Sequence, residues 1–278
     1  MALMRNFIPE VWDARLLHWL GVKFVFGGIV NTDYEGEIKG LGSIVHVNQI
    51  TGGSISNYTR GVDVVPDGID SNMTSFQINE AKNWACQVNA MDQAVMPFST
   101  LEANMQKYGY LMASAIDAYG LDVAYDGAGL AYAGSVATIG IADIPKMFAS
   151  INRQMDEANM QEDGRWVIIP PWLYEKMLLS NIGVMAQNNA ILANGVVGSY
   201  LGMTLKRSNA IPKANATDFQ CVAGAGNDAI TYAFKSIETS PYELPLQFER
   251  GVKSLFCYGA KVMLPDRLMG VLIKEKSE

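Results

Sequence analysis

The amino-acid sequence predicts an α+β fold on three observations. A single long amphipathic helix is expected over residues 99–119. Before it, short extended runs separated by glycines are typical of β-strands and turns. After it, helical and strand-like segments are mixed, and the chain from residue 246 is again strand-like.

The expected long helix carries an apolar stripe and clear signals at both ends. Ser99 and Glu102 fit a capping box, in which each side chain accepts a hydrogen bond from a backbone N–H near the helix start. Gly120 is the expected terminator, because glycine readily adopts the left-handed conformation that ends helices. At about 1.5 Å per residue the helix is a rod of roughly 30 Å joining two regions. Its stripe consists of Leu101, Met105, Tyr108, Met112, Ala115 and Tyr119.

The segments before the long helix predict one short helix and a poorly supported ribbon. Residues 9–20 predict a helix that starts near Pro9. From about 32 to 72 the large apolar residues are few and scattered, although 43–47 and 54–65 read as extended runs. A two-stranded ribbon with so little to bury is marginal on its own, so we expect its order to come from docking on a neighbouring copy. The alternative is a surface loop without fixed structure. The stripe of the short helix is Trp12, Leu16, Trp19 and Leu20.

Strands and helices are also expected on either side of the long helix. A return strand should run through Phe76 and Ile78, followed by a run with Trp84, Cys86 and Val88 on one face. Asp143 is the expected cap of a second amphipathic helix with the stripe Ile144, Phe148, Ile151, Met155 and Ala158. Further strands are expected at 165–170, 196–205, 219–222, 253–258, 261–264 and 269–273, and a short helix at 171–180.

The composition favours a protein that hides much of its surface in an assembly. The 278 residues allow one large domain or two smaller ones. Charged residues make up 18% of the chain, below the ~25% usual for soluble domains, while hydrophobic residues reach 49%. The net charge of −7 argues against a nucleic-acid-binding surface, which needs clustered lysine and arginine.

The sequence carries no targeting signal that we can identify. No apolar run approaches the ~20 residues of a membrane span. The N-terminus lacks the order of charged and apolar residues that marks a secretory signal. Cys86, Cys221 and Cys257 are odd in number and widely spaced, so we expect reduced thiols made in a cytoplasm.

No motif predicts a catalytic residue, a metal site or a cofactor. The two histidines, His18 and His46, have no second histidine or cysteine at metal-ligand spacing. We expect a packed or surface role for His18 and an exposed position for His46. With so few histidines, a Ser–His or Cys–His nucleophile pair lacks candidates. Residues 195–202 miss the G-x-S-x-G spacing of a nucleophile elbow.

The best formal motif lies at residues 224–229, where Gly-Ala-Gly-Asn-Asp-Ala matches the dinucleotide pattern G-x-G-x-x-A. A dinucleotide fold requires a helix next, whereas residues 230–234 favour a strand. The motif also comes too late in the chain to open a doubly wound sheet. We therefore predict a turn. A site of paired carboxylates that only folding brings together stays open as an alternative.

Two segments of the sequence resemble tailed-phage major capsid proteins of the Hong Kong 97-type fold. The first is the opening Phe7–Leu17 (FIPEVWDARLL), and the second is Asn57–Gly61 (NYTRG), in an extended loop ahead of the long helix. The resemblance covers nearly the whole chain and has no chemical signature. By position, it implies an N-terminal arm (1–30), an extended β-hairpin or E-loop (31–75), a peripheral domain with a spine helix at about 99–119 (76–130), an axial domain (131–245), and closing strands of the peripheral domain (246–278).

The resemblance implies a shell protein and no enzymatic activity. Many copies, as hexamers and pentamers, would form the icosahedral shell around the double-stranded DNA of a tailed phage, without sequence-specific DNA binding or a membrane. A scaffolding protein, a portal and decoration proteins are the implied partners. The protein would be made in the cytoplasm of a bacterial host and end in the virion, after procapsid maturation by subunit rotation. The alternatives are an encapsulin-type nanocompartment shell and a cytosolic α/β enzyme with an unrecognised site.

Covalent cross-linking of this shell is not expected. Some members of the family join an E-loop lysine to an asparagine of the peripheral domain. Lys39 lies in the right loop, but residues 246–278 contain no asparagine. Asp266 is no substitute, because an ionised carboxylate repels a nucleophile and has no ammonia to release.

Overall fold

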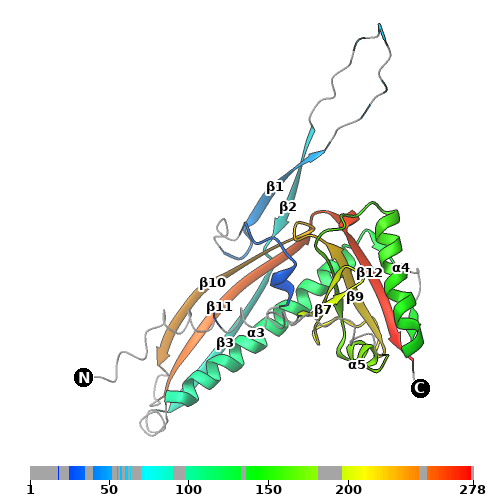
Figure 1. Cartoon of the computed structure of the whole chain (residues 1–278). Helices are drawn as coiled ribbons and strands as arrows, with labels where there is room; N and C mark the ends of the chain where they lie inside the picture. Colours follow the sequence, from blue (N-terminus) through cyan, green and yellow to red (C-terminus); the bar gives the residue numbers. More distant parts are fainter. Residues whose placement is uncertain are drawn as a thin grey trace.

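The chain forms an elongated body with a β-hairpin projecting from it (Figure 1). Two sheets, one long helix and two shorter helices make up the body. The computed structural model describes residues 18, 25–34, 40–51, 55, 57, 60, 61, 63, 70–89, 98–132, 136–180, 196–243 and 249–276.

The first sheet has three antiparallel strands in the order β10–β11–β3, and helix α3 (Phe98–Asp126) packs along it. The ring of Tyr108 stacks on Trp84 with centroids 4.9 Å apart. Further along the helix, Tyr119 meets Tyr258 edge-on at 5.2 Å. Both helix tyrosines belong to the stripe that the sequence predicts. The strands are β3 (Glu80–Asn89), β10 (Ile230–Glu243) and β11 (Glu249–Val262).

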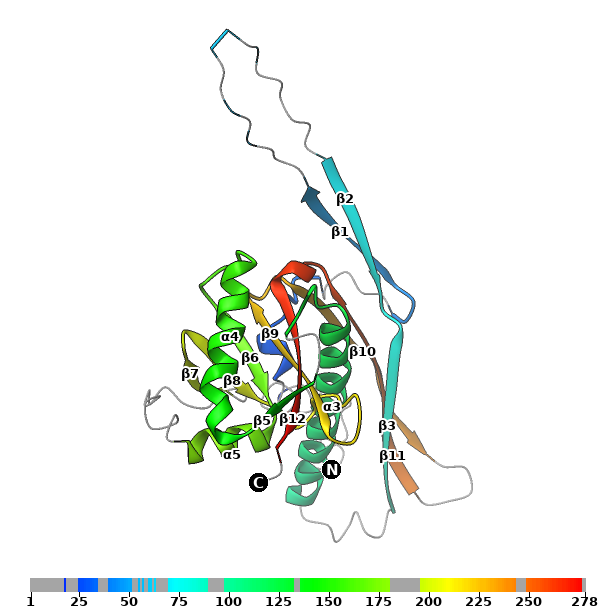
Figure 2. The same ribbon diagram turned by 90° about the vertical axis from the view of Figure 1, so that its right-hand side faces the viewer.

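The second sheet has seven strands, with the order β4–β12–β9–β6–β8–β7 and with β5 also paired to β12. Strand β12 runs antiparallel to β9 and parallel to β4 and β5. Helices α4 (Ile144–Glu157) and α5 (Pro171–Leu179) lie beside this sheet (Figure 2). The strands are β4 (Leu130–Ala131), β5 (Ala137–Ile139), β6 (Arg165–Ile169), β7 (Val196–Tyr200), β8 (Met203–Arg207), β9 (Asp218–Ala225) and β12 (Leu268–Glu275).

The projecting hairpin consists of β1 (Ile44–Thr51) and β2 (Asp70–Gln77), which pair antiparallel along their whole length. Both views show it extending past the body (Figures 1 and 2). Only Ile78 and Asn79 separate β2 from β3, so the chain passes almost directly from the hairpin into the three-stranded sheet. The body therefore holds the hairpin at its base.

The long helix differs from its predicted bounds at both ends. It begins at Phe98, so Ser99 lies inside it and is not the cap. The prediction that Gly120 ends the helix is wrong, because the helix continues to Asp126. A Cβ at Gly120 would lie 2.4 Å from the ring of Phe26. Glycine is thus used at this position for the close approach of an aromatic ring and not for a turn.

The other predicted elements that the structure describes are confirmed with local corrections, whereas the predicted helix at 9–20, apart from His18, and most of the extended run at 54–65 lie outside the described residues. The stripe of α4 is buried at Ile144, Phe148, Ile151 and Met155. The expected cap, Asp143, precedes α4, but its carboxylate accepts a hydrogen bond from the Gly140 N–H at 3.2 Å and not from the helix. The single strand expected at 196–205 is a hairpin, β7 and β8. The run at 253–258 lies on β11, whereas the run at 261–264 covers only the last two residues of β11 and the two residues before a 3-10 turn, η5 (Pro265–Arg267).

The division of the chain into arm, E-loop, peripheral and axial domains stays a prediction. Strand pairing does split the segment 246–278, which the resemblance assigns to one domain. Its strand β11 pairs with β3 and β10, whereas β12 pairs with β9 in the seven-stranded sheet. One continuous hydrophobic core spans α3 and both sheets, and it includes Phe26, Ile116, Trp166, Tyr258 and Met269.

Candidate assembly surfaces

The base of the hairpin is anchored on its own chain by a small core separate from the main one. Val45 and Val47 of β1 and Phe76 of β2 are buried there together with Ile78. Their partners on the body are Ala233, Cys257 and Met263, with Tyr34 and Leu264 packed alongside. The expectation that the ribbon owes its order to a neighbouring copy is therefore wrong for its base.

Away from this small core, the hairpin exposes apolar side chains. Met73 of β2 is 61% exposed and Ile55 is fully exposed; at the base itself, Ile44, next to the buried Val45, is 56% exposed. Water-exposed apolar groups on an element that leaves the body gain free energy when another surface covers them. The described part of the hairpin beyond its base thus has the character of a contact surface.

A second structural feature fastens the segment from Val25 to Asn31 to the body. The buried carboxylate of Asp117, in α3, accepts hydrogen bonds from the backbone N–H groups of Val25 (3.3 Å) and Phe26 (2.9 Å). Lys206 of β8 donates from Nζ to the carbonyl oxygen of Gly28 at 2.8 Å. We call this segment, residues 25–31, the arm anchor, because it follows the expected N-terminal arm.

The electrostatics of the arm anchor are dominated by burial. Desolvation raises the pKa of Asp117 from 3.8 to about 6, against the opposing effects of the two N–H groups and of Lys206. Desolvation also lowers the pKa of the Lys206 ammonium, although Asp117 opposes this. The two charged groups thus stabilise each other in a place where either one alone would be costly.

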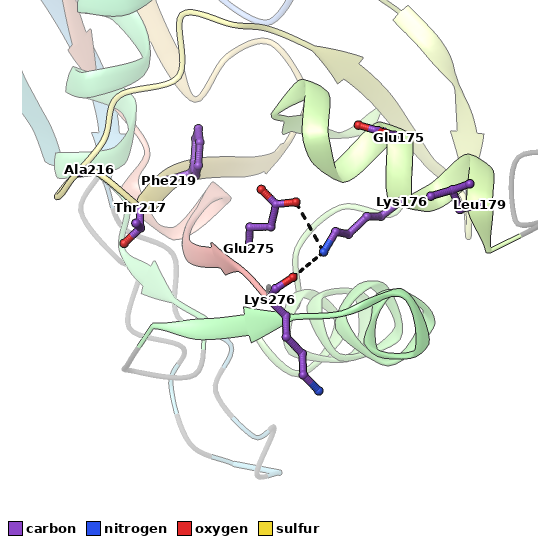
Figure 3. Close-up of a pocket in the computed structure, with 8 residues that line it drawn as sticks. All are labelled: Glu175, Lys176, Leu179, Ala216, Thr217, Phe219, Glu275 and Lys276. Carbon is purple, nitrogen blue, oxygen red and sulfur yellow. Dashed lines mark hydrogen bonds and ion pairs between the residues drawn. The ribbon is translucent and has the colours of Figure 1, made fainter. Parts of the chain in front are cut away.

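A cavity of about 590 Å³ lies between α5, the end of β12 and the loop before β9. Figure 3 shows Lys176 pointing across it towards the last described residues of the chain. Its Nζ donates to the carbonyl oxygen of Lys276 at 2.8 Å and pairs with the Glu275 carboxylate at 3.5 Å. The buried ammonium is therefore used to fasten β12 to α5. The lining residues are Glu175, Lys176, Leu179, Ala216, Thr217, Phe219, Glu275 and Lys276.

The residues that the sequence singled out for chemistry do not come together. His18 is helical and exposed, and His46 lies exposed on β1, as expected for it. Within the described ranges, no group of three or more His, Cys, Asp or Glu side chains could hold a metal ion. None of the helices that the structure describes is long and apolar enough to cross a membrane. Lys39 lies outside the described residues, and Asp266 is exposed in η5.

The three cysteines are free thiols without activation. Cys221 and Cys257 are buried, and Cys86 is half-buried beside Tyr108. Burial raises the pKa of each thiol above its ordinary value. Because the thiolate is the reactive form, none of them has the environment of a catalytic cysteine.

The glycine-rich motif at 224–229 is a connection between two strands, as predicted. Gly224 still belongs to β9, and β10 starts at Ile230. Gly226 has a φ of +73°, which glycine adopts without strain, and Asp228 forms an ion pair with Arg267. No helix follows, so the segment cannot present a helix N-terminus to a phosphate. Residues 196–202 likewise form strand β7 and its turn.

Sequence comparison gives no relative for this chain: no family model and no curated protein matches it.

The residues that sequence reasoning missed are Asp117 and Lys206. Helix α3 also carries Lys107 and Asp122, and β8 carries Arg207 next to Lys206, so no sequence signal separates these two buried charges from exposed ones.

Comparison of structures does find similar proteins. A chain from Mycobacterium phage Che8 has a TM-score of 0.68 and 23% identity, with 90% of this chain and 91% of that chain covered. The capsid of Ralstonia phage GP4 has a TM-score of 0.61 and 13% identity, covering 90% and 88%. A virus-like particle from Pyrococcus furiosus has a TM-score of 0.59 and 12% identity, covering 96% and 100%. The chain therefore has the α+β fold of phage capsid proteins, the fold that its sequence resemblance implies.

Proposed function

We propose that this protein is a shell-forming structural protein, the major capsid protein of a tailed phage. The observation that carries the proposal is the likeness to phage capsid structures over about nine tenths of both chains. Many copies would enclose double-stranded DNA, and the net charge of −7 fits a container that holds DNA by enclosure and counterions and not by a basic surface.

The surface of the chain supports self-association. Beyond its anchored base the hairpin exposes Ile55 and Met73. A chain with only 18% charged residues gains from covering such side chains by neighbouring copies. The partners are thus further copies of the same chain, arranged as hexamers and pentamers, together with a scaffolding protein and a portal. The expected place of the protein is the virion, after synthesis in the host cytoplasm.

An encapsulin-type nanocompartment is the second candidate, because the similar virus-like particle of Pyrococcus furiosus shows that the fold is not confined to phages. An enzyme is less favoured. The thiols have raised pKa values, and the one large cavity we describe is spanned by an ion pair that fastens β12.

The first experiment expresses the chain and examines it by sedimentation and electron microscopy. A shell protein gives closed particles of large mass, alone or with a co-expressed scaffolding protein. A stable monomer or small oligomer under both conditions would contradict the shell function.

The second experiment separates a phage capsid from a nanocompartment. Particles are isolated from the natural source and identified by mass spectrometry of this chain. A phage capsid protects DNA of genome length from nuclease, whereas a nanocompartment contains enzyme cargo and no protected genome. Enzyme cargo without a protected genome would show that the protein forms a nanocompartment and not a phage capsid, while its function as a shell protein would stand.

A further inference from the structure

The N-terminal half of α3 has a bare face with two large apolar side chains. Tyr110 is 53% and Leu111 is 52% exposed, and Lys107 and Ser114 beside them are also exposed. The three-stranded sheet covers the opposite side of the helix, where Tyr108 stacks on β3. This end of α3 runs alongside β3, β10 and β11 and away from α4, α5 and β12 (Figure 1).

The bare face lies on the same side of α3 as the arm anchor. Two residues seven apart on an α-helix differ in direction by only about 20° and in height by about 10 Å. Tyr110 is therefore in line with Asp117, two turns nearer the start of the helix. The N–H groups of Val25 and Phe26 are bound to Asp117, so the backbone nitrogen of Val25 lies on this side of α3.

We propose that residues 9–20 of the same chain dock as a helix on this bare face of α3. The predicted stripe of that segment, Trp12, Leu16 and Trp19, lies outside the described residues, but His18 within it is helical and exposed. A helix over residues 9–20 spans about 18 Å, and residues 21–24 bridge up to about 14 Å. The stripe can thus reach Tyr110 and Leu111 from the arm anchor.

The two surfaces are chemically complementary. Indole rings and a leucine on one side meet a tyrosine and a leucine on the other, and the small side chain of Ser114 leaves room for a ring. Asp13, next to the stripe, has a charge opposite to that of Lys107 beside the bare face. Tyr110 and Leu111 are about half exposed, so covering them with apolar groups removes apolar surface from water.

The test measures amide hydrogen exchange of residues 9–20 in the full chain, at a concentration below that at which it assembles. In the unmodified chain these amides are expected to be protected. In the double variant Tyr110→Ser/Leu111→Ser they should exchange about tenfold faster or more, while amides of β9 and β12 are unchanged, which shows that the body remains folded. Leu255→Ser is the matched control, because Leu255 is a 40% exposed leucine on β11.

A reciprocal variant, with the substitutions in the N-terminal segment, tests the same contact in a chain whose α3 is unchanged. Trp12→Ser/Leu16→Ser should increase the oxidation of Tyr110 by hydroxyl radicals severalfold. Unchanged exchange of residues 9–20 in the α3 variant, or the same acceleration in the Leu255 control, overturns the proposal. Protection that appears only as the chain associates assigns the face to the arm of a neighbouring copy and overturns docking within one chain. Since the test uses unassembled chains, it is independent of the proposed shell function.

Discussion

Replacement of Asp117 by asparagine tests how the arm anchor is held. The carboxylate is 4% exposed and accepts two backbone N–H groups, from Val25 and Phe26. Desolvation raises its pKa to about 6. A carboxyl group with a raised pKa binds its proton more readily in the folded state than in the unfolded state. Its contribution to stability is therefore fully present below the unfolded pKa of 3.8 and is lost as the pH rises through about 6.

The magnitude follows from the two pKa values. Between about pH 4.5 and about pH 7.5 the ionisation of Asp117 lowers the free energy of unfolding by about 2 kcal/mol. Asp117→Asn cannot ionise, so it lacks this loss. The free energy of unfolding of the variant, relative to the unmodified chain, should thus rise by about 2 kcal/mol over that pH range. Asp117→Ala should instead cost about 2–4 kcal/mol at the lower pH, because it leaves two buried N–H groups without an acceptor.

The assay is urea unfolding of the unassembled chain at several pH values, followed by circular dichroism. The difference between variant and unmodified chain cancels most other titrating groups. Asp122→Asn, an exposed carboxyl on the same helix, controls for the loss of one negative charge from α3. If Asp117→Asn and the unmodified chain follow parallel pH profiles, the carboxyl does not titrate as the buried geometry requires, and the reasoning fails.

Three further predictions concern packing and assembly. Gly120→Ala should destabilise the chain by about 1–3 kcal/mol in thermal unfolding despite the helix propensity of alanine, because its Cβ would lie 2.4 Å from the Phe26 ring; an unchanged melting temperature would contradict this. Met73→Glu, which places a charge on the exposed part of the hairpin, should abolish particles in electron microscopy without changing circular dichroism, whereas Ser75→Thr should assemble normally. Boiled, reduced particles should run as one band near 30.3 kDa, since residues 246–278 contain no asparagine for an isopeptide bond, and a covalent ladder would refute this.

The sequence predicts the elements of this fold better than their ends, and α3 shows why. Its stripe and its existence depend on residues three and four apart, which a pattern reads directly. The end of the helix does not depend on such a pattern. Gly120 has the local preference of a helix terminator, but in the fold it makes room for the ring of Phe26. Phe26 lies more than ninety residues earlier, and no local pattern reports such a contact.

The small core under the hairpin and the arm anchor were missed for a related reason. Val45 and Val47 alternate as a strand should, but two valines gave no sign of the buried Cys257 and Met263 that cover them. Asp117 reads as one more polar residue of a mixed helix face until the N–H groups of Val25 and Phe26 are placed against it. A cluster built from segments far apart in the chain is visible only after folding.

The arm anchor also restricts how this body can change shape. Lys206 holds it from the seven-stranded sheet through the Gly28 carbonyl, and Asp117 holds it from α3. Asn31 exchanges backbone hydrogen bonds of 2.8 and 2.9 Å with β10, which belongs to the three-stranded sheet. One short segment is thus bonded to both sheets and to the helix between them, so the sheets cannot rotate against each other without breaking buried polar contacts at a cost of about 1–3 kcal/mol each. If the shell changes shape during maturation, we therefore expect the motion in parts of the chain that the arm anchor does not hold. These parts are the hairpin beyond Val47 and the N-terminal half of α3, which does not lie against the seven-stranded sheet.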